Sequence, residues 1–478
     1  MKRLLLGLLT LFPVFAQETP TEREAARSVL EKMQALETSL DIPALVNKVT
    51  APNPERDIVV RRAKELMNSE MLALGDEITR DPEIGFQETR AVRKLTQVLE
   101  KHGFETEVGI AGLRTAFIGK YKRKSAPAGN SGPNLGVILE YDALRGTKGP
   151  FHGDQHSTQG PIGMAAAIAI AEYLDQKKLP GTVEVFGTPG EEMMPPEAKT
   201  VMFKGVVFKG VDVIMRSHAK NSTNRAAPGF GTCCLNINGV KYTFSGAPAH
   251  QMTPWAGRNA LEGVIHLFEN IDSVRSNIRP EARIQGVITE GGAAPNVVPD
   301  RAVADFYVRY PDAVYLRQVQ EFVDNAAKAA ALSTGTKVKI DLYGTDRDGI
   351  SVATLDEPAF VYEKMYGGTG VQSELGKPQG YEETGSVSSD IPGVGFAAKT
   401  SNAANHTYEM EADALTDVGH QGFLTDAQSM AALLFDVATR PEYLVLVKRE
   451  FAGIKALFGE YQSALEKAYS VPAVPEPK

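Results

Sequence analysis

Apolar strand-like runs and helix-like segments alternate along much of this chain, and this alternation restricts the folds that it can adopt. Strands are expected at 135–139, 183–186 and 211–215, and an Ala-rich helix is expected at 162–174. Such an order predicts an α/β fold in which a mainly parallel sheet lies between helices. Functional residues in sheets of this kind lie beyond the carboxyl ends of the strands.

An acidic pair follows the second of these strands, in the stretch Gly187-Thr-Pro-Gly-Glu191-Glu192. Adjacent carboxylates in such a turn can take separate roles, one binding a cation and the other moving a proton. Other candidate ligands occur before and after this turn: Asp154, His156, His218 and His406. One Asp, three His and one or two Glu form a ligand set suited to one or two divalent ions such as zinc or manganese. The set predicts a hydrolase.

Each candidate also has an ordinary structural interpretation. Paired glutamates usually lie on solvated faces, Asp154 and His156 fit a polar loop, and His406 alone carries almost no information. We expect the pattern Gly160-Pro-Ile-Gly163 to begin a helix, and a helix N-terminus favours anionic ligands. The combination of ligand types, and not any single residue, indicates a metal site.

The pattern changes near residue 235. Strand-like and helix-like segments then follow in the order β-α-β-β-α-β, which is typical of a ferredoxin-like module, at 235–244, 259–275, 284–289, 302–309, 316–331 and 338–343. Because His406 lies beyond this module, we expect the module to be inserted into the catalytic domain. The expected divisions are a signal peptide at 1–16, an N-terminal helical segment at 17–56, a catalytic domain in two parts at 57–234 and 349–440, an inserted ferredoxin-like domain at 235–348, and a C-terminal helical tail at 441–478.

The first residues are typical of a signal peptide. A charged start, Met1-Lys-Arg3, precedes an apolar run and small residues that end at Ala16, so we expect an exported protein, periplasmic or secreted. No later segment is long and apolar enough to span a membrane. A net charge of −8 without a basic cluster argues against a nucleic-acid partner. The only cysteines, Cys233 and Cys234, are neighbours, which argues against a disulfide framework.

The order of the motifs resembles that of a known family. The stretches that carry the resemblance, within roughly 81–439, are 81–88, 141–144, 152–156, 187–192, 246–250, 254–260 and 291–296. Together they are similar to the binuclear metal amidohydrolases that include aminoacylase, carboxypeptidase G and the plant auxin-conjugate hydrolases. Within that family the chain most resembles the branch that contains a subunit of aminobenzoyl-glutamate hydrolase. The family's α/β fold agrees with the architecture expected above, and the resemblance implies that the inserted domain at 235–348 is a lid and dimerisation domain.

The resemblance implies a role for each matching residue. It implies metal ligands at His156, Glu192, His218 and His406, and a general base at Glu191. Asp154 stands where this branch usually has a cysteine that bridges two metals, and a carboxylate can also bridge, which leaves the metal preference open. Asp142 and His152 would orient ligands through hydrogen bonds.

The lid offers three further candidates. His250 matches a family histidine that crosses a dimer interface and stabilises the oxyanion, while Asn296 and Arg309 could bind a substrate carboxylate. The alternatives are that Asn296 only shapes a turn and that Arg309 is a surface strand residue.

The resulting hypothesis is hydrolysis of an amide bond in small N-acyl amino acids, aminobenzoyl-glutamate-like conjugates or dipeptides. A water bound by two divalent ions per subunit, Zn²⁺ or Mn²⁺, would attack with Glu191 as general base, in a homodimer formed through the lid. Two alternatives remain open, a non-catalytic binding protein on the same scaffold and an aminopeptidase that acts on longer peptides. A serine hydrolase is disfavoured because the chain contains no Gly-x-Ser-x-Gly elbow.

Overall fold

The computed structural model describes residues 20–124, 132–193, 198–226, 230–231, 236–347, 349–373 and 385–470. The expected signal peptide, the two cysteines and the last part of the expected C-terminal tail, 471–478, lie outside these residues, so the predictions made for them stay predictions. None of the helices in the described part of the chain is long and apolar enough to cross a membrane.

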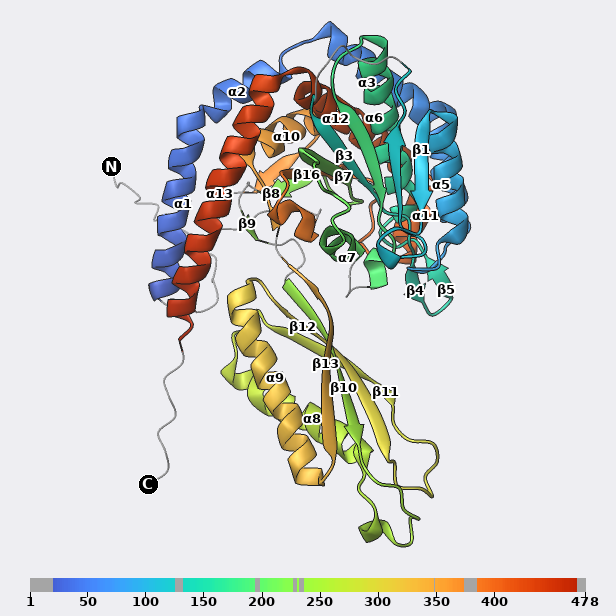
Figure 1. The fold of residues 1–478 in the computed structure, drawn as a ribbon, viewed down its shortest axis with the longest axis vertical. Helices are drawn as coiled ribbons and strands as arrows, with labels where there is room; N and C mark the ends of the chain where they lie inside the picture. The colour runs from blue at the N-terminus through green and yellow to red at the C-terminus, as the bar shows by residue number, and fades with distance from the viewer. Residues whose placement is uncertain are drawn as a thin grey trace, which may run out of the picture.

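A six-stranded sheet organises the upper part of the molecule (Figure 1). Its order is β1-β2-β6-β3-β7-β16, and the bounds are β1 Phe104–Val108, β2 Phe117–Tyr121, β3 Asn134–Leu139, β6 Thr182–Gly187, β7 Val213–Ser217 and β16 Gly393–Phe396. Strands β6, β3, β7 and β16 are parallel, whereas β2 pairs antiparallel with both β1 and β6. The predicted α/β fold with a mainly parallel sheet is therefore confirmed.

Helices cover both faces of this sheet. The larger apolar cluster joins Val137 of β3 to the helices on one face, while Ile138, the next residue, packs against α7 on the other. The helices around the sheet are α3 Pro54–Leu66, α4 Leu72–Thr79, α5 Thr89–Lys101, α6 His156–Gln176, α7 Ala198–Lys204, α10 Ala353–Gly367, α11 Tyr408–Ala414 and α12 Asp417–Thr439. Short strand pairs complete this part: β4 Leu144–Gly146 with β5 Gly149–Phe151, β8 Asn224–Ala226 with β15 Val371–Ser373, and β9 Phe230–Gly231 with β14 Gly349–Ile350.

Helix α6 begins earlier than its sequence indicated. Gly160-Pro161 predicted a start near residue 162, but the helix begins at His156 and contains Pro161. The first residues of α6 are fully buried, and the hydroxyl group of Thr79 donates a hydrogen bond of 2.7 Å to that of Ser157. Tertiary contacts thus hold a first turn that local propensity does not favour.

The lid forms a separate four-stranded antiparallel sheet of order β11-β12-β10-β13. Its elements are β10 Asn236–Ser245, α8 Ala260–Val274, β11 Arg283–Glu290, β12 Arg301–Tyr310, α9 Ala313–Thr334 and β13 Lys337–Asp346. Both helices lie on one face, where Phe244, Leu267 and Phe306 belong to a second apolar core. The predicted β-α-β-β-α-β order is present, and it falls between β7 and β16 of the first sheet.

Two helices from opposite ends of the chain lie side by side along one flank (Figure 1). They are α1 Pro20–Leu40, which continues into α2 Ile42–Thr50, and α13 Pro441–Ala468. Helix α13 packs against the core of the first sheet through Phe451 and against the lid core through Leu465. Beyond its last turn, the hydroxyl group of Tyr469 donates a hydrogen bond of 2.8 Å to Asp312 at the start of α9.

Candidate metal centre

The loop that follows β5 carries the first candidate ligands. The main-chain nitrogen of His406 donates a hydrogen bond of 3.0 Å to the Gly153 carbonyl oxygen, and a Cβ atom at Gly153 would lie 3.0 Å from the Cα atom of His406. Gln155 has a left-handed φ of 53°, and its side-chain nitrogen donates a hydrogen bond of 2.6 Å to the carbonyl oxygen of Met410. These contacts bring two segments that are far apart in the sequence to the carboxyl edge of the sheet.

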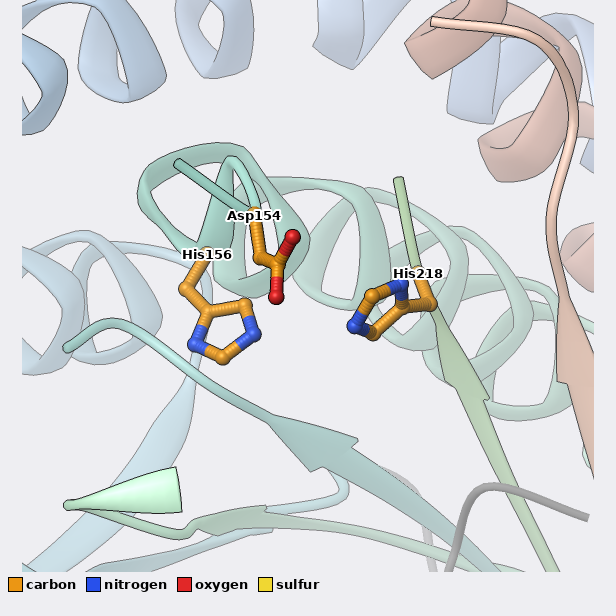
Figure 2. Close-up of side chains that lie close together, drawn as sticks. All are labelled: Asp154, His156 and His218. Carbon is orange, nitrogen blue, oxygen red and sulfur yellow. The ribbon is translucent and has the colours of Figure 1, made fainter. Parts of the chain in front are cut away.

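The expected ligands meet at this edge. Ligand atoms of Asp154, His156 and His218 all lie within 4.8 Å of one another, and so do those of Asp154, Glu192 and His406. Figure 2 shows the carboxylate of Asp154 between the rings of His156 and His218, whose centroids are 5.7 Å apart. Asp154 is shared by both groups, so its two oxygens can bridge a pair of cations.

Asp142 fixes the orientation of two of these residues. Its Oδ1 atom lies 2.9 Å from Nδ1 of His156, and its Oδ2 atom accepts a hydrogen bond of 2.9 Å from the main-chain nitrogen of Glu192. The other ring nitrogen of His156, Nε2, is buried and has no hydrogen-bond partner among the described residues. A buried imidazole nitrogen without a partner, beside several carboxylates, fits a bound divalent ion.

The electrostatic field of the cluster also fits a cation. Burial raises the pKa of Glu192 to about 10, and the neighbouring charge of Glu191 acts in the same direction. Burial opposes a charge on His156, yet the hydrogen bond to Asp142 and the nearby carboxylates raise its pKa well above the ordinary value. The site therefore favours positive charge, which a divalent ion would supply.

Glu191 belongs to a third group, with His156 and Glu192, whose ligand atoms lie within 4.8 Å of one another. Its Oε2 atom is 3.9 Å from Nε2 of His156, and the side chain is 20% exposed. Burial raises the pKa of Glu191, and the negative charge of Glu140 adds to this shift. Glu191 is absent from both groups that contain Asp154, which leaves its carboxylate available for proton transfer.

Two residues beside the ligands, Asn405 and Glu140, were not assigned a role from the sequence. The Asn405 amide nitrogen donates a hydrogen bond of 2.6 Å to Asp154, and His406 Nε2 lies 2.9 Å from the other oxygen of Asp154. Glu140, at the end of β3, is buried behind His156 and accepts hydrogen bonds from Arg216 at 2.7 Å and from Lys199 at 2.8 Å. The available signal for Glu140 was a charged residue directly after an apolar run.

The orienting role expected of His152 is not visible in its ring contacts. The ring is buried and makes no hydrogen bond to a ligand side chain; the backbone of Asp142 and Ile78 faces it. Its main-chain nitrogen donates a hydrogen bond of 2.7 Å to Glu411. His152 therefore holds the loop through its backbone and through packing.

The lid candidates lie at two ends of the lid. Arg309 is on the face of β12 opposite the lid helices, 5.8 Å from the Tyr307 ring centroid. Burial lowers the pKa of Arg309 and the negative charge of Glu191 opposes that shift, which places Arg309 within electrostatic reach of Glu191. His250 and Asn296 are exposed and lie on adjacent loops, since the Gln251 main-chain nitrogen donates a hydrogen bond of 3.1 Å to the Asn296 carbonyl oxygen.

These two loops follow β10 and precede β12, at the end of the lid remote from the six-stranded sheet (Figure 1). The structure thus brings together the five expected ligands, and Glu191 and Asp142 lie beside them. The charge of Arg309 interacts with that of Glu191. The structure does not bring His250 or Asn296 to the cluster of the same chain.

Comparisons with known proteins agree with this geometry. Residues 235–334 match the peptidase dimerisation domain of the M20 family. The chain is 27% identical to the Xaa-Arg dipeptidase of Mus musculus over 415 residues, which cover 84% of this chain and 94% of that protein. It is 31% identical to a subunit of the p-aminobenzoyl-glutamate hydrolase of Escherichia coli over 282 residues, which cover 56% of each protein.

The fold is also that of a solved relative. A dinuclear metal-binding peptidase of the M20 family from Bacillus subtilis superimposes with a TM-score of 0.52 at 18% identity, over 78% of this chain and 99% of that one. The resemblance seen in the motifs is thereby confirmed, and so is the prediction of a metal-dependent hydrolase. Over most of its length the chain is similar to peptidases and amidohydrolases of the M20 family, and it is a metal-dependent hydrolase.

Proposed function

We propose that this enzyme cleaves the amide bond of a small N-acyl amino acid, an aminobenzoyl-glutamate-like conjugate or a dipeptide. The observation that carries the proposal is the position of Asp154, which lies in two ligand groups at once. His156 and His218 would complete the site on one side of Asp154, and Glu192 and His406 would complete it on the other. This set of imidazole and carboxylate ligands suits two ions of the zinc or manganese kind.

Divalent ions held by these residues would supply Lewis acidity, which would acidify water and polarise the scissile carbonyl group. Glu191 takes a proton from the attacking water and returns it to the leaving amine. Asp142 keeps His156 and the backbone of Glu192 in the orientation that the ligand groups require. Arg309 would bind a carboxylate of the substrate, because its guanidinium charge interacts with that of Glu191 and a guanidinium group can hold a carboxylate in a bidentate manner.

The same proposal assigns the remaining lid residues to a partner subunit. His250 and Asn296 lie on loops at the end of the lid remote from the six-stranded sheet, and the lid matches a dimerisation domain. In a homodimer, these loops would reach the cluster of the other chain, where His250 stabilises the oxyanion.

The test measures metal content and turnover in the wild-type enzyme and in one substituted enzyme. Turnover should disappear with a chelator and return with Zn²⁺ or Mn²⁺, on a panel of N-acyl amino acids, aminobenzoyl-glutamate and dipeptides. Glu191→Gln should keep the metal and lower kcat by about 100-fold or more, while Glu105→Gln, on the edge strand β1, serves as the matched control. Full activity of Glu191→Gln would remove the general base from the mechanism.

The same panel separates the alternatives. An aminopeptidase would prefer free-amine peptides of increasing length over N-acylated compounds. A non-catalytic binding protein would show no turnover at full metal occupancy.

A further inference from the structure

The turn that carries Glu191 and Glu192 rests on the loop before α5, and a buried carboxylate joins the two. Glu88, at the end of that loop, is fully buried. Its Oε1 atom accepts a hydrogen bond of 2.8 Å from the main-chain nitrogen of Gly190, the residue before Glu191. Its Oε2 atom accepts a hydrogen bond of 2.7 Å from the hydroxyl group of Thr115. Glu88 belongs to none of the ligand groups.

The two segments approach each other too closely for larger residues. Gly190 has a φ of 66°, and a Cβ atom there would lie 2.6 Å from the ring of Phe86. A Cβ atom at Gly85 would lie 2.6 Å from the Cα atom of Gly190. Phe86 itself has a φ of 64°, a conformation that is rarely adopted by an aromatic residue and that the surrounding structure must hold in place.

A second buried carboxylate holds the other side of the same turn. Asp142 accepts the main-chain N–H group of Glu192, so Glu191 lies between two backbone groups that are each fixed by a carboxylate. Burial raises the pKa of Glu88 to about 7, and the charge of Asp142 acts in the same direction. Glu88 is therefore buried near Asp142 although the two carboxylates repel each other. In this position its carboxylate provides a fixed acceptor for the Gly190 N–H group.

We propose that Glu88 is a positioning residue for the reaction: by holding the Gly190 N–H group, it sets the direction in which the Glu191 carboxylate leaves the turn. It touches neither substrate nor metal ligand side chains, and it acts only through Glu191. The inference rests on the proposed role of Glu191 as general base. Its rival is that Glu88 only stabilises the fold.

The test compares three substitutions on the same loop. Glu88→Gln keeps a carbonyl oxygen for Gly190, because its amide group can donate to the Thr115 oxygen instead, so kcat should stay within about threefold of wild type. Glu88→Leu removes the acceptor, and a displaced general base should lower kcat by about 10- to 100-fold while KM and metal content stay within about twofold. Glu83→Gln is the matched control, because Glu83 is also buried but caps α5 by accepting the N–H groups of Arg90 and Ala91.

Two further variants separate positioning from stability. Thr115→Val removes the hydrogen bond from the Thr115 hydroxyl group to Glu88 Oε2 and should lower kcat in the same direction, by about two- to fivefold, even if Glu88→Leu does not fold. In the Glu191→Gln background, Glu88→Leu should have no additional effect on kcat, because the residue acts through Glu191.

The inference is overturned if Glu88→Gln is as slow as Glu88→Leu, if Glu83→Gln lowers kcat equally, or if Glu88→Leu slows the Glu191→Gln enzyme by the same factor as the wild type. A fully active Glu191→Gln enzyme would refute the general base itself. An inactive Glu191→Gln enzyme beside fully active Glu88→Leu and Thr115→Val enzymes would refute only the positioning role.

Discussion

Asp142→Asn offers a quantitative test of how the metal centre is held. A carboxylate can only accept hydrogen bonds, so Asp142 faces an N–H group at each oxygen, one from the His156 ring and one from the Glu192 backbone. An amide group has one acceptor and one donor. Asn at this position can therefore satisfy only one of the two groups, and its NH₂ group faces the other donor.

The size of the effect follows from burial and charge. The His156 and Asp142 side chains are fully buried, so the hydrogen bond that is lost involves a charged acceptor shielded from water. Such a bond contributes about 1.5–3 kcal/mol. Because about 1.4 kcal/mol corresponds to a tenfold change in an equilibrium constant, divalent metal binding should weaken by about 10- to 100-fold.

The assay is competition between the metal-free enzyme and a chromophoric chelator, with unfolding followed in parallel. Asp212→Asn is the control, because Asp212 accepts a 2.8 Å hydrogen bond from the main-chain nitrogen of Asn134 and lies just before β7, at the opposite end from the cluster. The control variant should bind metal like the wild type. Metal affinity of Asp142→Asn within twofold of wild type, in folded protein, would refute the reasoning.

Two other predictions concern α1 and the lid. Burial and the charges of Glu450 and Glu357 raise the pKa of Glu37 from 4.5 to about 7, so the folded state loses stability as the pH rises through this interval. The free energy of unfolding of Glu37→Gln should therefore equal that of the wild type below pH 4.5 and exceed it by about 1–2 kcal/mol above pH 7, a difference that allows for screening by solvent. Urea unfolding at both pH values measures this difference. For the dimer, chains carrying Glu191→Gln mixed with chains carrying His250→Ala should recover about a quarter of wild-type amidase activity, because half of the randomly mixed dimers contain one intact site. A mixture no more active than its components would show that His250 does not serve a partner's site.

The elements with a strong apolar pattern could be predicted closely from the sequence. The expected strand at 183–186 corresponds to β6 Thr182–Gly187, because Val183, Val185 and Phe186 lie between Gly181 and Gly187. The antiparallel edge formed by β1 and β2 was not foreseen, since strand direction depends on connections that have no local signature. The early start of α6 was missed because Gly160-Pro161 locally indicates a helix start, whereas burial of the preceding turn decides the outcome.

The residues that meet in the cluster could be predicted because the combination of their types and the order of the motifs indicates a shared site. Asn405 and Glu140 could not, because each acts through a contact with a residue that is distant in sequence, Asp154 in one case and Arg216 in the other. Glu88 was part of a motif that carried the family resemblance, but only the structure shows that its carboxylate meets the backbone of Gly190. These three contacts depend on how the loops pack against one another at the carboxyl edge of the sheet.

The end of α13 has a consequence for biosynthesis. Leu465 and Tyr469 complete an apolar core that is otherwise built by residues of the lid, more than a hundred positions earlier in the chain. While the ribosome is still translating the segment that follows β13, this core lacks its last two side chains and leaves an apolar surface open to water. The lid therefore reaches its final packing only after the C-terminal residues have left the exit tunnel, and a nascent chain stalled before residue 465 would offer that surface to chaperones.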